Sequence, residues 1–289
     1  MLIEYGSLFY CIYLFLPVGL TVLLTFLFRK KSLRAQKGAV LAILLLNVFQ
    51  HIFKLQIYPQ YDGGFSPIVT AYNLCAFLIL FSPIAFFSKR QGMKDCICIL
   101  GTAAGLGAML FPTWFLGLSA FSWEIYRFYI CHGLLLMGSV LPLSLGFHKF
   151  SRRSVLKIPF FFLLAQAVIL CNDALLICAG YYGSSVTPDQ LFAHLYRSNP
   201  CWTMHPGPLP WLNEIILAFC PSFFTHNAAG ETFYWPILWC ALPLILGMWI
   251  LGIPLSFALD FKGVKEDWHK AKRVCQRFVG TVKDRFRRT

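Results

Sequence analysis

The sequence is poor in charged residues and poorest in acidic ones. Only 13% of the 289 residues are charged, and 12 Asp and Glu stand against 25 Lys and Arg. Soluble domains carry roughly one quarter charged residues. Because 58% of the residues are hydrophobic, we expect neither a soluble globular enzyme nor a disordered basic tail. We also expect no nucleic-acid binding, since the chain lacks a polar surface on which basic residues could gather.

The sequence also lacks the motifs of cofactor-dependent chemistry. We find no internal repeat, no low-complexity tract, no phosphate-binding glycine loop and no carboxylate-rich metal motif. The pair Cys96 and Cys98 lies at the end of a span, and we expect no zinc site there. No metal or nucleotide cofactor is therefore implied.

Long apolar runs dominate what is present. A hydrocarbon core of ~30 Å needs about 20 apolar residues per helical span. Seven such runs occur, at 7–28, 38–58, 67–88, 96–115, 124–147, 157–180 and 234–259. The first has no basic leader and is expected to be retained rather than cleaved. The sequence predicts an all-α, polytopic cell-membrane protein of about seven transmembrane helices, forming a single bundle over residues 1–260.

The basic residues predict the orientation of this bundle. Seven spans place four segments on one side, and these hold 22 of the 25 Lys and Arg residues: 29–37, 89–95, 148–157 and 260–289. Cytoplasmic loops are enriched in Lys and Arg. We therefore expect the N-terminus outside and the C-terminus in the cytoplasm. Lys54, Arg127 and Arg197 are the exceptions.

Two segments outside the spans have patterns of their own. The outer segment 181–233 contains a helix start at Thr187-Pro188-Asp189, and 209–220 is expected to form a short interfacial helix. Cys201 and Cys220 both lie in this segment and are compatible with a disulfide. The tail 261–289 repeats apolar residues every three or four positions, with basic residues between them. This pattern favours an amphipathic helix whose residues 262–289 bind anionic inner-leaflet lipids, a solvated helix being the alternative.

Polar residues inside the spans are functional candidates, because lipid penalises them. They are Asn47, His51, Lys54 and Tyr58 in the second span, Asn73 and Cys75 in the third, Arg127, Tyr129 and His132 in the fifth, and Gln166, Asn172 and Asp173 in the sixth. Counted from the outer ends, most share a layer about 10–12 Å below the outer surface. The pattern indicates a polar cavity open to the outside. The alternative is a structural network, for example an ion pair of Lys54 with Asp173.

Cys75 and His132 are the candidates for chemistry within this layer. A buried thiol is inert unless a base lies beside it, and His132 at the same depth could be that base. Asn73, Asn172 or Asp173 could orient the imidazole. A thiol and a histidine at this depth suit acyl transfer through a thioester, although single Cys and His residues are more often packing residues.

Several stretches resemble the YwaF-like integral membrane family. They are Asn73-Leu74-Cys75-Ala76-Phe77-Leu78 followed by Ser82-Pro83-Ile84-Ala85, Gly101-Thr102-Ala103-Ala104-Gly105 with Pro112, Arg127-Phe128-Tyr129-Ile130-Cys131-His132-Gly133-Leu134, and Gly207-Pro208-Leu209-Pro210-Trp211. The vertebrate branch of that family contains cysteine-dependent phospholipid acyltransferases. The resemblance implies that the nucleophile is Cys75 and the histidine His132. The sequence departs from the family pattern at Asn73, where His or Glu is common, and at Ala76, where Asp is common.

Together these observations predict a Cys–His acyltransferase that acts on membrane phospholipids from the outer leaflet. Cys75 is the expected nucleophile and His132 the general base, with His51 and Tyr129 in the polar cavity. Arg127 and Lys54 are expected to hold a lipid phosphate. The alternatives are a non-catalytic transporter or a solute- or lipid-binding protein using the same cavity, or a structural membrane partner.

Overall fold

The computed structural model describes residues 1–57, 67–180, 186–207 and 210–259, together with Lys265, Glu266, Trp268 and Lys272. Within these residues the chain is helical, and its only extended pairings are two isolated bridges. Tyr58 lies outside the described residues. So does the predicted tail 261–289, apart from the four residues just named. The expected all-α fold is confirmed for the described part of the chain.

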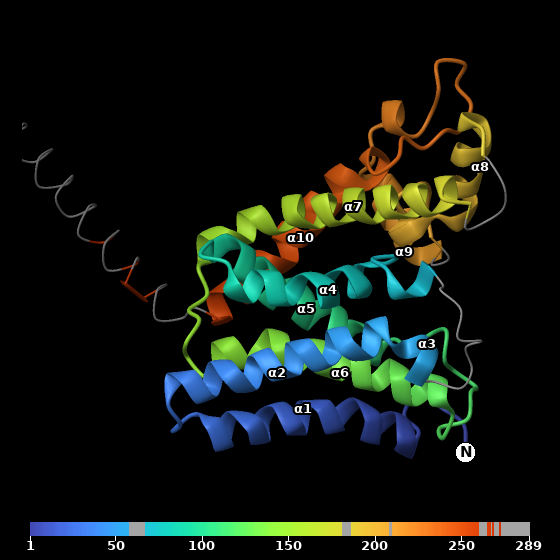
Figure 1. Cartoon of the computed structure of the whole chain (residues 1–289). Helices are drawn as coiled ribbons and strands as arrows, with labels where there is room; N and C mark the ends of the chain where they lie inside the picture. Colours follow the sequence, from blue (N-terminus) through green and yellow to red (C-terminus); the bar gives the residue numbers. More distant parts are fainter. Residues whose placement is uncertain are drawn as a thin grey trace, which may run out of the picture.

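Long helices form the body of the protein and lie side by side along its length (Figure 1). They are α1 (Leu8–Phe28), α2 (Leu33–Ile52), α4 (Leu74–Phe87), α5 (Gln91–Leu110), α6 (Trp123–Ser144), α7 (Ile158–Cys178) and α10 (Leu238–Leu259). Five of them, α1, α2, α5, α6 and α7, are long and apolar enough to cross a membrane, whereas α4 and α10 contribute shorter apolar stretches.

Helix α6 is the centre of the bundle and contacts α1, α2 and α5. Its close approach to α5 depends on glycines that are four residues apart, as in membrane helix pairs with small residues at the interface. A Cβ atom added to Gly105 would lie 2.9 Å from the carbonyl oxygen of His132 and 3.0 Å from the amide nitrogen of Leu136. One added to Gly101 would overlap the hydroxyl of Ser139. These two glycines therefore fix how near α5 comes to the backbone of α6 at His132.

Several helices begin at other residues than the hydropathy predicts, and the causes are clearest for α4 and α5. The third apolar run was expected to be helical from residue 67, but α4 begins at Leu74, after a short 3₁₀ helix at Pro67–Val69. The cause is Asn73, which is extended and caps the helix with its side chain. Helix α5 spans 91–110 rather than 96–115, because a buried Asp95 is accommodated in its first turns and Pro112 disfavours helix at the preceding residue.

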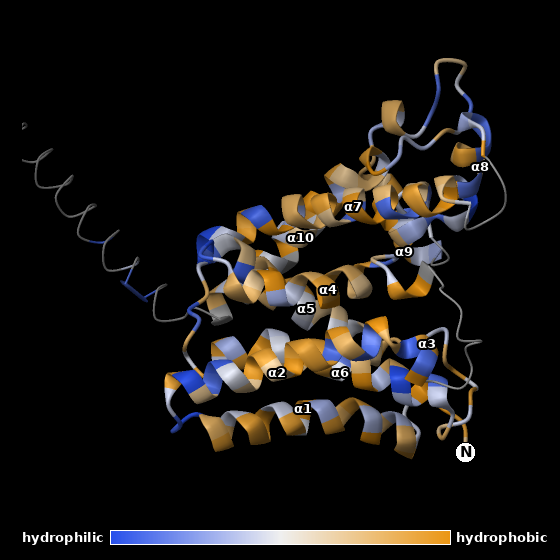
Figure 2. Ribbon diagram, viewed as in Figure 1, coloured by the Kyte–Doolittle hydropathy of each residue, from blue (hydrophilic) through white to orange (hydrophobic). Residues whose placement is uncertain are grey.

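The basic loops gather at one end of the bundle. The turns at 29–32, 88–90 and 145–157 all lie at the end where α2 begins, on the left of Figure 1. Figure 2 shows hydrophobic residues along most of each long helix and hydrophilic residues mainly towards the two ends. This arrangement is compatible with the predicted orientation, which itself stays a prediction.

The outer segment follows its expected local structure. Helix α8 (Pro188–Ser198) begins with a capping box between Thr187 and Gln190, as the sequence predicts. Helix α9 (Pro210–Ala218) forms within the predicted 209–220 range. The disulfide between Cys201 and Cys220 is not formed, since both are free thiols in the structure.

Candidate functional site

Cys75 occupies the first turn of α4, at the end of the bundle opposite the basic loops. The side chain of Asn73 accepts a hydrogen bond from the amide of Ala76 at 2.8 Å and so caps the turn that carries the thiol. The unpaired N–H groups of a first helical turn favour negative charge beside them. The side chain of Cys75 is only partly buried. This location suits a thiol that must become a thiolate and meet a substrate.

The imidazole of His132 lies beside Cys75. Its Nδ1 is 2.7 Å from the carbonyl oxygen of Phe128, one turn earlier in α6, and 3.2 Å from Sγ of Cys131. A carbonyl oxygen only accepts hydrogen bonds, so Nδ1 carries the hydrogen and Nε2 is left as the proton acceptor. The imidazole therefore bonds the thiol of Cys131 and interacts with the thiol of Cys75. The structure thus brings together Cys75 and His132, which the sequence predicts to lie at the same depth in two spans.

Among the described residues, neither an amide nor a carboxylate side chain orients this imidazole, in contrast to the sequence-based expectation. The backbone carbonyl of Phe128 takes that place. Asn73 is used as the cap of α4, and Asp173 on α7 accepts a hydrogen bond from Ser198 at 2.6 Å. Among the described residues Lys54 forms no ion pair with Asp173 either, and its ammonium donates to the backbone at Ile68.

The polar residues of α2, α3 (Lys54–Ile57) and α7 hold the segment that leads into Cys75. Lys54 is buried, donates to the carbonyl of Ile68 and lies 5.0 Å from the ring centroid of Tyr72. His51 Nε2 is 3.2 Å from the carbonyl oxygen of Thr70. A carbonyl buried at membrane depth needs a donor, and these two side chains supply one to each of two carbonyls.

The same segment is held from the opposite side by α7. The amide of Asn172 donates to the hydroxyl of Thr70 at 2.9 Å. The expected polar layer is therefore occupied at these positions by residues 68–72 rather than by open space. His51, Lys54 and Asn172 act on Cys75 indirectly, by fixing the chain that precedes it. Arg127 interacts electrostatically with both His51 and Lys54.

Tyr129 is not part of this group. Its ring stacks on Tyr13 of α1 with centroids 5.0 Å apart, and its buried hydroxyl has no hydrogen-bond partner among the described residues. It therefore packs the interface of α1 and α6.

Two neighbours of the Cys–His pair were missed from the sequence. Cys131 was seen only as a hydrophobic residue, although its adjacency to His132 was a usable signal. Cys201 comes from the outer segment and interacts with the backbone of Leu74 and with Cys75. Burial raises the pKa of the Cys201 thiol to about 12, so it stays protonated. Its carbonyl accepts from Gln166 of α7 at 3.2 Å, which joins the outer segment to the bundle at the site.

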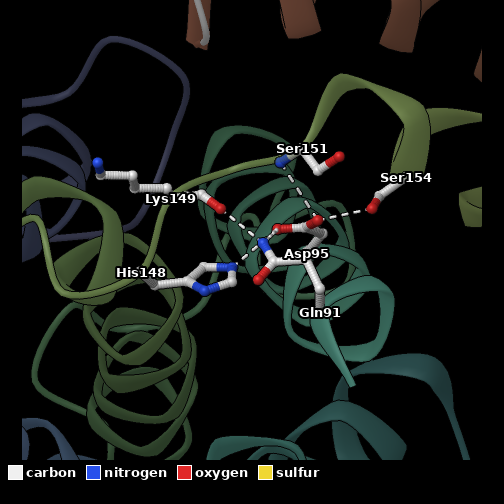
Figure 3. A network of polar contacts seen from close by, with 6 residues as sticks. All are labelled: Gln91, Asp95, His148, Lys149, Ser151 and Ser154. Atoms are coloured by element: carbon white, nitrogen blue, oxygen red, sulfur yellow. Dashed lines mark hydrogen bonds and ion pairs between the residues drawn. The ribbon is translucent and has the colours of Figure 1, made fainter. Parts of the chain in front are cut away.

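A second polar network lies at the basic end of the bundle (Figure 3). Asp95 of α5 is fully buried and receives hydrogen bonds from His148 at 2.8 Å, Gln91 at 3.0 Å and the Ser154 hydroxyl at 2.6 Å, as well as from the amide of Ser151. The sequence alone places Asp95 at the end of the predicted basic loop 89–95. The polar cluster between His148 and Ser154 was the signal that could have found it.

Among the described residues, no three His, Cys, Asp or Glu side chains gather as a metal site requires.

The comparisons with known proteins identify a family. No curated protein and no solved structure matches the chain. The YwaF-like relation and its acyltransferase activity therefore stay predictions. The model of the TMEM164 family matches residues 5–202, which include Cys75, His132 and the segments that hold them. The chain is an integral membrane protein and belongs to the TMEM164 family.

Proposed function

We propose that this TMEM164-family protein is a thiol-dependent acyltransferase that acts on membrane phospholipids. The observation that carries the proposal is the interaction of the His132 imidazole with the thiol of Cys75, while Nδ1 is held by the carbonyl of Phe128. That arrangement leaves Nε2 able to accept a proton, as a general base must. The first turn of α4 supports the resulting thiolate.

The reaction needs only these two side chains and two lipid substrates. His132 Nε2 accepts the proton of Cys75, and the sulfur attacks the carbonyl carbon of a lipid ester. The bond to the ester oxygen breaks, and the imidazolium returns its proton to the departing alcohol, which leaves an acyl-thioester. An acceptor hydroxyl then loses its proton to Nε2 and attacks the thioester. The carbon–sulfur bond breaks, and the proton on Nε2 restores the thiol.

In this proposal Arg127 holds the phosphate of the substrate. The buried ammonium of Lys54 donates to the carbonyl of Ile68 and supports the site by fixing the chain before Cys75. The proposal also keeps the N-terminus outside and the C-terminus in the cytoplasm, in a multi-pass cell-membrane protein. Cys75 then faces the outer leaflet, since the basic loops lie at the other end.

The test is a search for the acyl-thioester itself. The protein is expressed, purified with its lipids and analysed by peptide mass spectrometry for an acyl adduct that hydroxylamine removes. We expect the adduct on Cys75 in the wild type, its loss in Cys75→Ala, and strongly slowed formation in His132→Gln.

Cys131→Ala is the matched control, because Cys131 contacts the same imidazole but is buried. It is expected to keep the adduct. A wild type without any adduct, or an adduct that persists in Cys75→Ala and disappears in Cys131→Ala, contradicts the proposal. The transporter and structural alternatives predict that Cys75→Ala keeps full function.

A further inference from the structure

A cavity of about 610 Å³ opens at the basic end of the bundle, far from Cys75 along the helices. It is bounded by α2, α4, α5 and α6 and by the loops that follow α4 and α6. Its lining residues include Arg34, Lys37 and Gly38 on α2, whose spacing places them on one helix face. This volume falls within the range of small-molecule sites and is far larger than a free phosphate needs.

The cavity has a basic mouth without acidic neighbours. Four cations line it, Arg34, Lys37, Lys89 and Lys94, and no Asp or Glu does. The nearest carboxylate, Asp95, is engaged by His148 and its other partners. Among the described residues none of the four cations has an ion pair. Such a cluster attracts an anion, and clusters of this kind beside a membrane bind anionic headgroups.

The deeper walls are apolar. Leu41 and Leu44 of α2, Ala85 of α4 and Ile97 of α5 line the cavity, and all but Leu41 are buried. Phe87 also lines it and is 69% exposed, at the end of a short apolar helix. The cavity therefore joins the polar end of the bundle to its apolar flank.

We propose that this cavity binds an anionic glycerophospholipid. Its phosphate lies among Arg34, Lys37 and Lys89, where charge-assisted hydrogen bonds hold it. The upper part of one acyl chain follows the apolar wall formed by Leu41 and Leu44. A soluble anion would use the mouth alone and leave the apolar wall without a partner. The site is independent of the acyltransferase proposal, because it shares no residue with it.

The network around Asp95 builds one wall of this site. His148 lines the cavity, and its Nε2 is held by the carboxylate of Asp95. Figure 3 shows the other ring nitrogen turned away from that carboxylate. Ser151 and Ser154 bind the same carboxylate, so the loop before α7 is fixed against α5. The buried acid thus positions a cavity wall and leaves the cations of the mouth unneutralised.

The test uses the full chain in a neutral detergent and two soluble lipids of equal chain length. Dioctanoyl phosphatidylglycerol is titrated against the unfolding temperature, with dioctanoyl phosphatidylcholine and inorganic phosphate as separate arms. A ligand that binds only the folded state raises the unfolding temperature in a concentration-dependent way. We expect a rise with phosphatidylglycerol and little change with the other two. An equal rise with phosphatidylcholine, or the full rise with phosphate alone, overturns the proposal.

Two variants locate the binding. Arg34→Gln with Lys37→Gln removes two cations of the mouth and is expected to weaken phosphatidylglycerol binding about thirtyfold, at about 1 kcal/mol per basic residue. The matched control is Lys30→Gln with Lys31→Gln. It removes the same charge from the neighbouring turn, which does not line the cavity, and should leave the affinity within about threefold. An equal loss in both double variants shows a general charge effect and rejects the site.

A third variant obstructs the cavity without removing charge. A Cβ atom at Gly38 meets no atom within 4 Å, so Gly38→Leu can be accommodated and fills space at the mouth. Leucine also favours helix over glycine, so loss of binding would not reflect unfolding. We expect phosphatidylglycerol to lose at least tenfold in affinity. Unchanged affinity in a stable Gly38→Leu protein contradicts the proposed location.

Discussion

The contact between α5 and α6 gives the sharpest test of how the site is built. Replacing Gly105 by alanine adds one methyl group, whose carbon would lie 2.9 Å from the carbonyl oxygen of His132. Ordinary contact needs about 3.5–4 Å, so the two helices must separate by roughly 0.5–1 Å. Overpacking of this size costs about 1–3 kcal/mol. The better helix propensity of alanine returns about 0.5–1 kcal/mol. We expect a net loss of about 1–2 kcal/mol.

The same displacement should reach the chemistry. The backbone that moves is that of His132, and its imidazole is the partner of Cys75. A misplacement of about 1 Å can cost up to a hundredfold in rate, so acyl-adduct formation on Cys75 should fall at least tenfold. The free energy of unfolding is measured in mixed micelles by titration with a denaturing detergent. Adduct formation is followed by mass spectrometry in the same samples.

Gly107→Ala is the matched control. It lies on the same helix, but an added Cβ atom meets nothing within 4 Å. We expect it to gain about 0.5–1 kcal/mol and to keep its rate of adduct formation. If Gly105→Ala proves as stable and as fast as Gly107→Ala, the tight approach of α5 to His132 is not what positions the imidazole.

Three further predictions concern other parts of the chain. Asn73→Ala removes the cap of α4 and should cost about 1 kcal/mol and slow adduct formation on Cys75, while Asn73→Asp restores the cap and most of the rate. Asp95→Asn sets an amide donor against neighbouring donors and should lower the unfolding free energy by about 3 kcal/mol, whereas Lys149→Gln should leave it nearly unchanged. The pKa of the Cys201 thiol is raised from 9.0 to about 12, so its contribution is present below pH 9 and lost as the pH rises towards 12. Between pH 9 and 11 the wild type should therefore lose stability more steeply than Cys201→Ala, and equal slopes would count against burial of this thiol.

Most of the helical architecture was predictable from hydropathy, because a long apolar run in lipid has few alternatives to helix. The ends were less predictable, since they depend on single polar residues. In the sequence Asn73 looks like a polar residue inside a span. In the structure it caps α4, which therefore begins at Leu74, seven residues later than expected. Asp95 reads as a loop acid, yet four hydrogen-bond donors let it be buried within α5.

The candidate site was predictable in its pair but not in its support. Equal depth on two helices was enough to place Cys75 near His132. It could not show that His51 and Lys54 donate to backbone carbonyls of the chain before Cys75, because those carbonyls carry no sequence signal. The four basic residues of the cavity were interpreted only as topological anchors. Their second use depends on helix packing, which brings Arg34 of α2 and Lys89 of the loop after α4 to one mouth.

The length of α4 has a consequence for the membrane in which the protein lies. Fourteen helical residues extend about 21 Å, whereas a typical hydrocarbon core is about 30 Å thick. With the basic end of α4 at one boundary of the hydrocarbon core, its other end stops roughly 9 Å short of the opposite boundary. Cys75 lies at this recessed end. Hydrophobic mismatch then sets how far an ester group must descend to reach the thiol. Thinner bilayers bring the glycerol level closer to Cys75, so the lipid chain length of the host membrane becomes a determinant of access to the site.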